Sequence, residues 1–147
     1  MSIYRHIVLG LDLNSEEEIT LIRKAQELAK TFNAELTVVH AIEHINSYGI
    51  GQAYPGVLEI EEELAKGALA KLNAICAAFN IPPENQVVNI GSTKIVILET
   101  VQQKNADLII IGSHGRHGLA LLLGSTADSL LHQSSYDVLA LHLSKQN

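Results

Sequence analysis

A glycine-bearing segment in the last third of the chain has the residue types and spacing of a phosphate-binding loop. Residues 112–118 read GSHGRHG, and residues 124–126 read GST at the start of a predicted helix. Glycines let backbone N–H groups approach a ligand closely, and a helix N-terminus adds unpaired N–H donors and a positive dipole end. A structural interpretation also stands, because Ser125 with Asp128 forms an ordinary capping box and the glycines can serve a tight turn.

A second candidate for ligand chemistry is the segment formed by Gly10, Leu11 and Asp12, which follows the first predicted strand. In an open α/β sheet, ligands bind beyond the carboxyl ends of the strands, where the strand order reverses. Asp12 therefore either faces a ligand or caps the turn into the first helix. Arg116, the strong base within the glycine segment, either binds a phosphate bidentately or is a solvated loop charge.

The elements that must position these residues alternate along the chain. Short runs of aliphatic and β-branched residues predict strands at residues 3–11, 36–42, 86–90, 107–111 and 137–143. Apolar residues at helical spacing predict helices between them, the last over residues 125–133. This order predicts an α/β fold, an open five-stranded parallel sheet with helices on both faces. Since no repeat or linker interrupts it, residues 1–147 are predicted to form a single domain.

Helical spacing also predicts which side chains the helices bury. The expected buried residues of the first three helices are Ile19, Ile22, Ala25, Ala29 and Phe32; Leu64, Ala68, Leu72, Ile75 and Phe79; and Ile95, Leu98 and Val101. Ser15 with Glu18 predicts a capping box for the first helix, and Pro82 with Pro83 is expected to stop the second. Cys76 follows the apolar pattern of the second helix and is predicted to fill the core.

The composition excludes several classes of function. The chain is 47% hydrophobic and 4% aromatic with a formal net charge of -6, which disfavours the phosphate contacts and base stacking of nucleic-acid binding. A single cysteine forms neither an internal disulfide nor a Cys-based zinc site. Apolar runs of about six residues fall short of the roughly 18 that a membrane helix needs. With no signal-peptide pattern, a cytoplasmic protein with no nucleic-acid or membrane partner is predicted.

The sequence predicts no metal site and no enzyme active site. His114 and His117, like His40 and His44, lie at short spacing, but no further ligand completes a recognisable set. The motifs G-x-x-x-x-G-K-[ST] and G-x-S-x-G are absent, and the first strand is not followed by G-x-G-x-x-G. A nucleophile, a base and an orienting group cannot be assembled from neighbouring elements.

Several motifs together resemble the universal stress protein A family. The second predicted strand contains VVHA, residues 106–116 read ADLIIIGSHGR and residues 123–127 read LGSTA. The resemblance covers residues 4–143 and is most specific in the last third. It implies a five-stranded parallel sheet in the order 3-2-1-4-5 and a homodimer joined through the final strand, residues 137–143. Many members of the family bind ATP through the pattern G-x2-G-x9-G-[ST].

Carried over residue by residue, the resemblance implies an adenine-nucleotide site. Gly112, Gly115, Gly124 and Ser125 would bind the triphosphate and ribose, with Thr126 at the phosphate end. Asp12 would face the ribose or a phosphate-bound metal such as Mg²⁺, and Ala41 would offer its backbone to the adenine. The full set of implied ligand-binding residues is Gly10, Leu11, Asp12, Ala41, Gly112, Gly115, Arg116, Gly124, Ser125 and Thr126.

The glycine segment departs from the family pattern in one respect. Eight residues, 116–123, separate Gly115 from Gly124, where the nucleotide-binding pattern has nine. The family branch that binds no nucleotide shares the shorter spacing but replaces the glycines, which this chain retains. The resemblance therefore implies ATP or AMP as the ligand, with Mg²⁺ accompanying ATP.

Three hypotheses about function follow. The leading one is an adenine-nucleotide-binding regulator or sensor of the stress response, acting as a homodimer and at most a slow ATPase. The alternative is a nucleotide-free dimeric scaffold that acts through protein contacts. The retained glycines favour the leading hypothesis over this alternative. A weaker alternative is a small enzyme acting on an adenylated substrate, against which the missing catalytic set argues.

Overall fold

The protein folds around one parallel β-sheet covered by helices on both faces. The computed structural model describes residues 3–13, 17–45, 56–112 and 136–141. The strands are β1 (His6–Gly10), β2 (Glu35–Ile42), β3 (Gln86–Ile90), β4 (Leu108–Gly112) and β5 (Asp137–Leu141). All neighbouring strands are parallel and their order is β3-β2-β1-β4-β5. The predicted fold class and strand order are confirmed.

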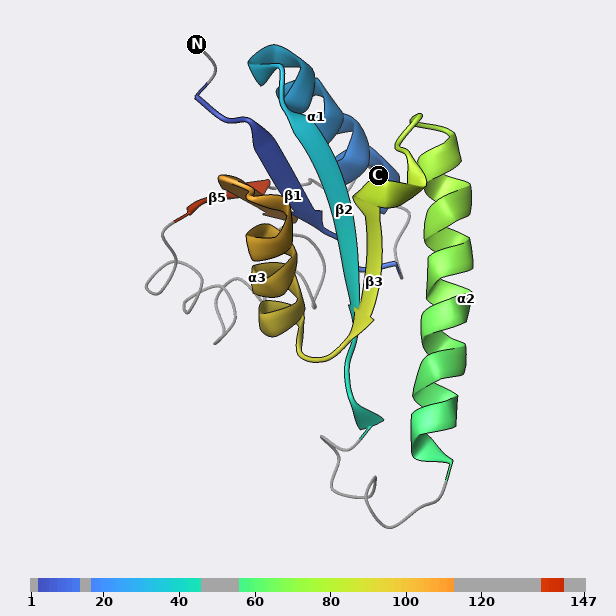
Figure 1. Ribbon diagram of the computed structural model, residues 1–147. Coiled ribbons are helices and arrows are strands. Elements are labelled where there is room, and N and C mark those ends of the chain that lie inside the picture. The colour runs from blue at the N-terminus through green and yellow to red at the C-terminus, as the bar shows by residue number, and fades with distance from the viewer. Residues whose placement is uncertain (1–2, 14–16, 46–55, 113–135, 142–147) are drawn as a thin grey trace.

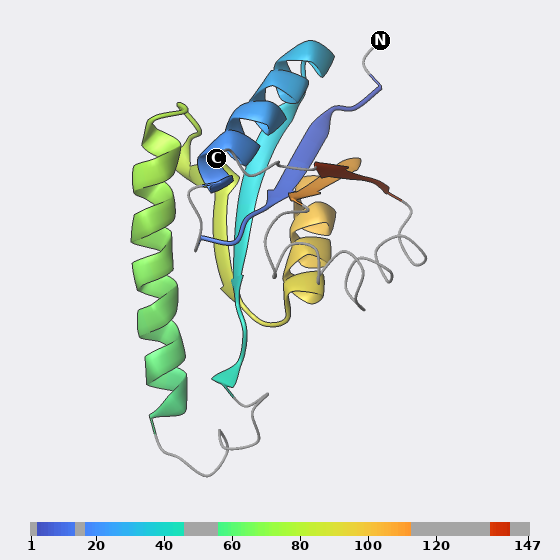
Figure 2. The same ribbon diagram turned by 180° about the vertical axis from the view of Figure 1, so that it is seen from behind.

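Three helices connect these strands within the described residues. They are α1 (Glu17–Phe32), α2 (Val57–Ala77) and α3 (Thr93–Lys104), and a short 3-10 turn (Pro83–Asn85) precedes β3. The helices α1 and α2 cover one face of the sheet and α3 covers the other (Figures 1 and 2). The helix predicted over residues 125–133 lies outside the described residues.

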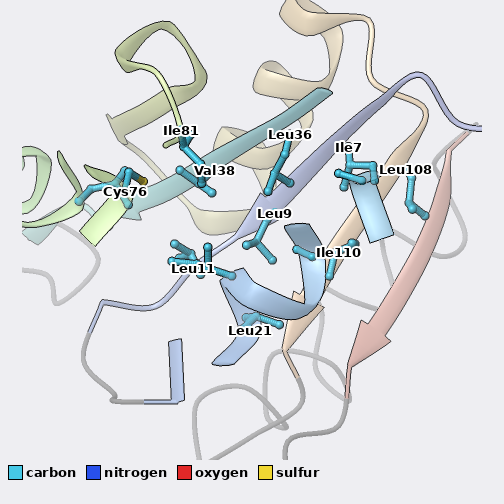
Figure 3. Close-up of a cluster of buried hydrophobic side chains, with 14 of the residues drawn as sticks. Ile7, Leu9, Leu11, Leu21, Leu36, Val38, Cys76, Ile81, Leu108 and Ile110 are labelled. Atoms are coloured by element: carbon cyan, nitrogen blue, oxygen red, sulfur yellow. The ribbon is translucent and has the colours of Figure 1, made fainter. Parts of the chain in front are cut away.

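The two faces of the sheet carry separate hydrophobic clusters because successive strand residues point to opposite sides. On the side of α1 and α2, Ile7, Leu9 and Leu11 of β1 and its extension pack with Leu21 and the side chains around it (Figure 3). On the side of α3, Val8 packs with the buried residues of that helix. Beyond the end of β1, the half-buried Asp12 lies between two buried leucines, at positions 11 and 13.

All three helices end in the same way. Asn33, Asn80 and Asn105 follow α1, α2 and α3 with φ values of 54°, 57° and 53°, in the left-handed region. The next residue in each case donates its N–H to a carbonyl five positions back, at 2.8, 3.2 and 2.9 Å, as in a Schellman motif. Helix α2 ends at Ala77 and closes through this asparagine turn, before the prolines that were predicted to stop it.

The predicted buried faces are right in their centres and wrong at three positions. Ile19, Leu64 and Ile95 are 44%, 50% and 53% exposed, whereas Ile22, Leu72 and Val101 are buried. In α1 and α2 a glutamate occupies the inward position instead, at residues 18 and 61. A shift of one residue turns a side chain by about 100° around a helix, so the stripe that faces the sheet lies to one side of these three residues.

Candidate functional site

The candidate ligand-binding region, here called the binding edge, lies at the carboxyl ends of the strands. The strand order runs outward from β1 in both directions, through β2 to β3 and through β4 to β5, so the reversal lies between β1 and β4. The β1–β2 register pairs Gly10 with Val39, and two further steps along both strands bring Asp12 level with Ala41. The β1–β4 register pairs Leu9 with Ile110. Gly112, the last residue of β4, is therefore at nearly the same level.

The backbone from residue 11 to residue 13 is held by groups from three other elements. The N–H of Leu11 donates to Val39 O at 2.9 Å, and Nδ1 of His40 lies 2.8 Å from Leu11 O. Because a carbonyl only accepts, His40 carries its proton on Nδ1 in this contact. The N–H of Asp12 donates to Glu18 Oε2 at 3.2 Å, and Lys71 Nζ donates to Leu13 O at 2.6 Å. These bonds fix the backbone from which the half-buried Asp12 side chain projects.

Two buried carboxylates support this edge of the sheet. Glu18, in the first turn of α1, is 1% exposed, and Glu61 of α2 is 3% exposed. Glu61 Oε2 accepts the N–H of Ile45 at 2.9 Å and lies 3.1 Å from Nδ1 of His44. A buried carboxylate is costly unless hydrogen-bonded, so these contacts hold the chain that leaves β2 against α2.

Gly10 performs a packing function on the α3 side. A Cβ atom added at this position would lie 3.1 Å from Ile97 Cδ1 and 3.5 Å from Ile111 Cγ2. The first distance is shorter than ordinary van der Waals contact, so the absence of a side chain lets α3 approach β1. The close approach at Gly10 is thus to another part of the protein.

The structure brings together some of the predicted site residues. Gly10, Leu11, Asp12, Ala41 and Gly112 lie at the ends of three neighbouring strands. The other predicted residues, all from the glycine segment, lie outside the described residues; they are Gly115, Arg116, Gly124, Ser125 and Thr126. Ser15 of the predicted capping box also lies outside them.

Sequence reasoning missed Glu61 and Lys71, and it assigned Glu18 to a helix capping box rather than to its contact with Asp12. A signal for the two glutamates was available, because each occupies the apolar stripe of its helix, Glu18 in line with Ile22 and Glu61 in line with Leu72. A charged residue on such a stripe indicates a buried group with a dedicated partner. Lys71 carried no such signal, since its partner is a main-chain carbonyl 58 residues away.

Metal-ligating and nucleophilic side chains do not gather in the described part of the chain. No group of three or more His, Cys, Asp or Glu side chains is placed to hold a metal ion among residues 3–13, 17–45, 56–112 and 136–141. His40 and His44 have separate partners, Leu11 O and Glu61. Burial raises the pKa of the Cys76 thiol to about 11, which makes it a weak nucleophile near neutral pH.

None of the described helices is long and apolar enough to cross a membrane.

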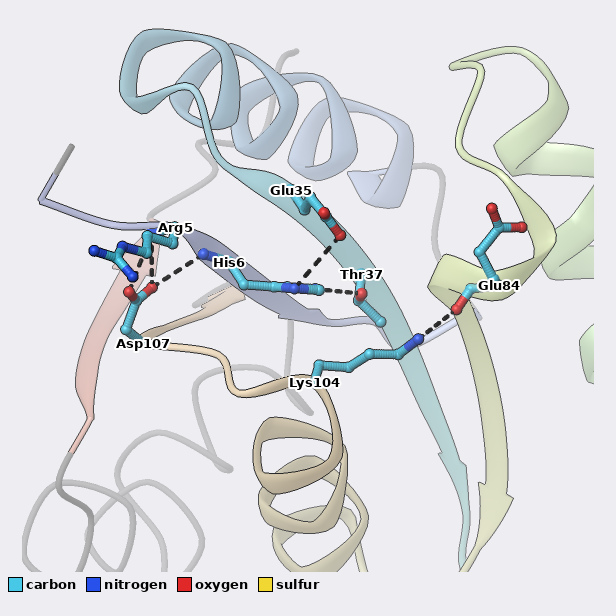
Figure 4. Close-up of polar contacts among 7 residues, drawn as sticks. All are labelled: Arg5, His6, Glu35, Thr37, Glu84, Lys104 and Asp107. Atoms are coloured by element: carbon cyan, nitrogen blue, oxygen red, sulfur yellow. Dashed lines mark hydrogen bonds and ion pairs between the residues drawn. The ribbon is translucent and has the colours of Figure 1, made fainter. Parts of the chain in front are cut away.

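The opposite edge of the sheet, where the strands begin, has its own polar cluster (Figure 4). His6 Nε2 lies 2.6 Å from Thr37 Oγ1, which joins β1 to β2. The Asp107 carboxylate accepts the N–H groups of Arg5 and His6 at 3.0 to 3.2 Å, which joins the chain before β4 to β1. Burial lowers the pKa of His6, assisted by Lys104 and opposed by the carboxylates of Glu35 and Asp107.

The fold defines an open α/β protein with a parallel sheet, a class in which ligands bind beyond the strand ends where the strand order reverses. The family model described as universal stress protein family matches residues 3–142. The chain belongs to this family, and the resemblance inferred from its motifs is confirmed.

Comparisons with individual proteins agree with this assignment. Universal stress protein A homolog 2 of Coxiella burnetii is 39% identical over 143 residues, covering 97% of this chain and 98% of the relative. Homolog 1 of the same organism is 37% identical, covering 94% and 96%.

Solved structures share the fold at lower sequence identity. The hypothetical protein MJ0577 matches with a TM-score of 0.71 at 22% identity, covering 98% of this chain and 99% of that one. A universal stress protein in complex with cAMP matches with a TM-score of 0.60 at 22% identity, covering 97% and 98%.

Proposed function

We propose that this protein binds an adenine nucleotide at the ends of β1, β2 and β4 and acts as a cytoplasmic regulator or sensor of the stress response. The observation that carries the proposal is the fixed backbone of residues 11–13, which presents Asp12 level with Ala41 at the strand-order reversal. The presence of cAMP in a universal stress protein of the same fold supports the choice of an adenine nucleotide.

Each residue of the site has a proposed part in binding. The main chain at Ala41 receives the adenine, and the main chain of Gly10 and Leu11 forms a wall of the pocket. Gly112 begins the phosphate-binding segment, in which backbone N–H groups and hydroxyls hold the phosphates without requiring a cluster of basic residues. The remaining proposed phosphate-end residues are Gly115, Arg116, Gly124, Ser125 and Thr126.

Asp12 fits a role toward the ribose or toward Mg²⁺. Its carboxylate projects from a fixed backbone at the strand ends, and carboxylate oxygen is the protein ligand that Mg²⁺ prefers when phosphates supply the others. When bound, Mg²⁺ would neutralise phosphate charge. The proposed action is binding and regulation rather than metabolic catalysis, with at most slow hydrolysis of ATP.

The protein is also proposed to act as a homodimer joined through β5. Among the described strands β5 pairs only with β4 and forms one edge of the sheet. Its first residue, Asp137, accepts a hydrogen bond from Tyr4 Oη at 2.6 Å, which holds the start of the strand against the N-terminal segment. An ordered edge strand of this kind readily pairs with a second chain.

The eight-residue spacing between Gly115 and Gly124 favours a second candidate, a nucleotide-free dimer that acts through protein contacts. Nucleotide released from the purified protein by denaturation would be identified by chromatography, and ATP and AMP would then be titrated by calorimetry with and without Mg²⁺. Binding of either nucleotide supports the first candidate. If no nucleotide co-purifies and no heat of binding is observed, and the protein is dimeric by light scattering, the second candidate is established.

A pair of variants tests where the nucleotide binds. Gly124→Val is expected to abolish binding while leaving the dimer and the melting of the nucleotide-free protein nearly unchanged. Gly67→Val is the matched control, because a Cβ added at this exposed position on α2 meets nothing within 4 Å beyond its chain neighbours and the backbone of its own helix. Equal loss of binding in both variants would contradict the proposed position of the phosphates.

A further inference from the structure

Helix α2 contacts both chain segments that leave the proposed site. Lys71 Nζ donates to the carbonyl of Leu13 at 2.6 Å, and Leu13 directly follows Asp12. One oxygen of Glu61 accepts the N–H of Ile45 at 2.9 Å and lies 3.1 Å from Nδ1 of His44, in the segment that follows β2. The helix therefore touches the chain just beyond Asp12, which is proposed to face the ribose or Mg²⁺, and just beyond the proposed adenine side.

The two contacts are well separated along one rigid element. Glu61 and Lys71 are ten positions apart, which corresponds to roughly 15 Å of helix. Both project toward the strand ends, as their partners require. Figure 1 shows α2 running alongside β3, with its first turns beyond the end of the sheet. Since one straight helix carries both contacts, it sets the distance between the two segments.

Glu61 makes the firmer of the two attachments. Its side chain is 3% exposed, and its contacts with the segment after β2 supply donors to a charge that has little access to water. If that segment moved away, the carboxylate would lose these donors while still buried, which is strongly unfavourable. Lys71 extends from the helix surface to a carbonyl of the buried Leu13 and adds the second attachment.

We propose that Glu61 and Lys71 are positioning residues, through which α2 holds the two sides of the nucleotide site at the separation that the ligand requires. This inference rests on the proposed function. A loop released from α2 would populate the binding-competent arrangement only part of the time, and the apparent Kd rises in inverse proportion to that population. The residues thus determine affinity without touching the nucleotide.

Four single variants on the same helix test the inference. Glu61→Gln and Lys71→Met keep most of each side chain and remove its charge. The controls are Glu63→Gln and Lys66→Met, which break a surface pair with a 3.6 Å separation whose side chains are 76% and 75% exposed. Calorimetry would give the Kd for AMP and for ATP with Mg²⁺, and thermal melting would show that each variant is folded at the temperature used.

The expected result is that Glu61→Gln and Lys71→Met each weaken nucleotide binding by roughly tenfold, whereas the two controls bind like the unaltered protein. Lys71→Arg, which retains a cationic donor, should restore most of the affinity. A purely structural role would lower the melting temperature and leave the Kd of the folded protein unchanged, and that result would overturn the inference.

Hydrogen exchange on the nucleotide-free protein provides a readout that is independent of binding. The amide of Asp12 should exchange faster in Lys71→Met, and the amide of Ile45 faster in Glu61→Gln, with no change in either control. Unchanged exchange at both amides would overturn the inference while leaving the proposed function intact. Failure of the unaltered protein to bind any nucleotide would instead overturn the proposed function, and the positioning role with it.

Discussion

The two edges of the sheet use polar side chains in different ways. Where the strands begin, polar groups join neighbouring strands directly, as His6 does with Thr37 and Asp107 does with the main chain of β1. Where the strands end, Glu18 and Glu61 instead hold the main chain of segments that have already left the sheet.

The difference separates a structural edge from a candidate binding edge within one fold. At the strand beginnings, the polar side chains contact one another or the main chain at the start of an adjacent strand, so their removal should reduce stability. At the strand ends, they hold Asp12, His44 and Ile45 just beyond the strands, so under the proposed function their removal should weaken nucleotide binding. Four predictions test this contrast.

The largest expected effect is on stability at Gly10, which belongs to the candidate binding edge but packs against α3. Gly10→Val should destabilise the protein by about 1–3 kcal/mol, because its Cβ alone meets Ile97 at 3.1 Å. Urea unfolding would measure the change, with Gly67→Val as the control. An unchanged midpoint would show that α3 yields freely, and the packing function assigned to Gly10 would then be wrong.

Asp107→Ala tests the structural edge. The variant leaves the N–H groups of Arg5 and His6 without their carboxylate acceptor and should cost about 1–2 kcal/mol of unfolding free energy. Nucleotide affinity should not change. Glu62→Ala, at an exposed position on α2, is the control for loss of a surface acid. A change in nucleotide Kd without a loss of stability would remove the contrast between the edges.

Asp12→Asn tests the opposite edge. Unfolding free energy should stay within about 0.5 kcal/mol of the unaltered protein, whereas nucleotide binding should weaken by about tenfold because a charged contact is lost. Calorimetry with AMP and with ATP and Mg²⁺ would localise the carboxylate. A larger loss for ATP with Mg²⁺ indicates a metal contact, and equal losses indicate the ribose. Full affinity for both ligands would refute a binding role.

The smallest expected effect is a pH dependence at His6. Burial lowers its pKa in the folded state, so the unfolded chain binds more protons there once the pH falls below about 6.5. The contribution of His6 is therefore fully present above that pH and is lost as the pH falls through the lowered folded pKa. Urea unfolding at about pH 7.5 and about pH 5.5 should show a smaller difference for His6→Gln than for the unaltered protein. An equal difference would assign the pH dependence to other groups.

Local patterns predicted much of the fold. The apolar runs at residues 36–42 and 107–111 correspond closely to β2 and β4, because a strand buried on both faces needs a continuous apolar sequence. The alternation of strands and helices predicted a parallel sheet, whereas the strand order came from the resemblance to a known family. The predicted strand at 3–11 is longer than β1, since the regular pairing covers only His6–Gly10.

The candidate site was predictable only in part. Asp12 could be placed at a strand end because it follows a recognisable strand, and Ala41 because it is the next-to-last residue of another. The positions of Glu18 and Glu61 were not predicted, since the neighbouring Ile19 and Leu64 gave a more apolar stripe at nearly the same helical spacing. The difference between two such stripes amounts to a modest rotation of the helix, which depends on what the helix packs against.

The sequence by itself determined the order of strands and helices and membership of the universal stress protein family. These properties depend on residues close together in the chain or on whole-chain similarity. Only the tertiary structure decided which acids are buried and which loops they hold. Glu61 meets Ile45 from 16 residues away and Lys71 meets Leu13 from 58. Such pairs form only after the helices have packed on the sheet, because packing fixes both their distance and their burial.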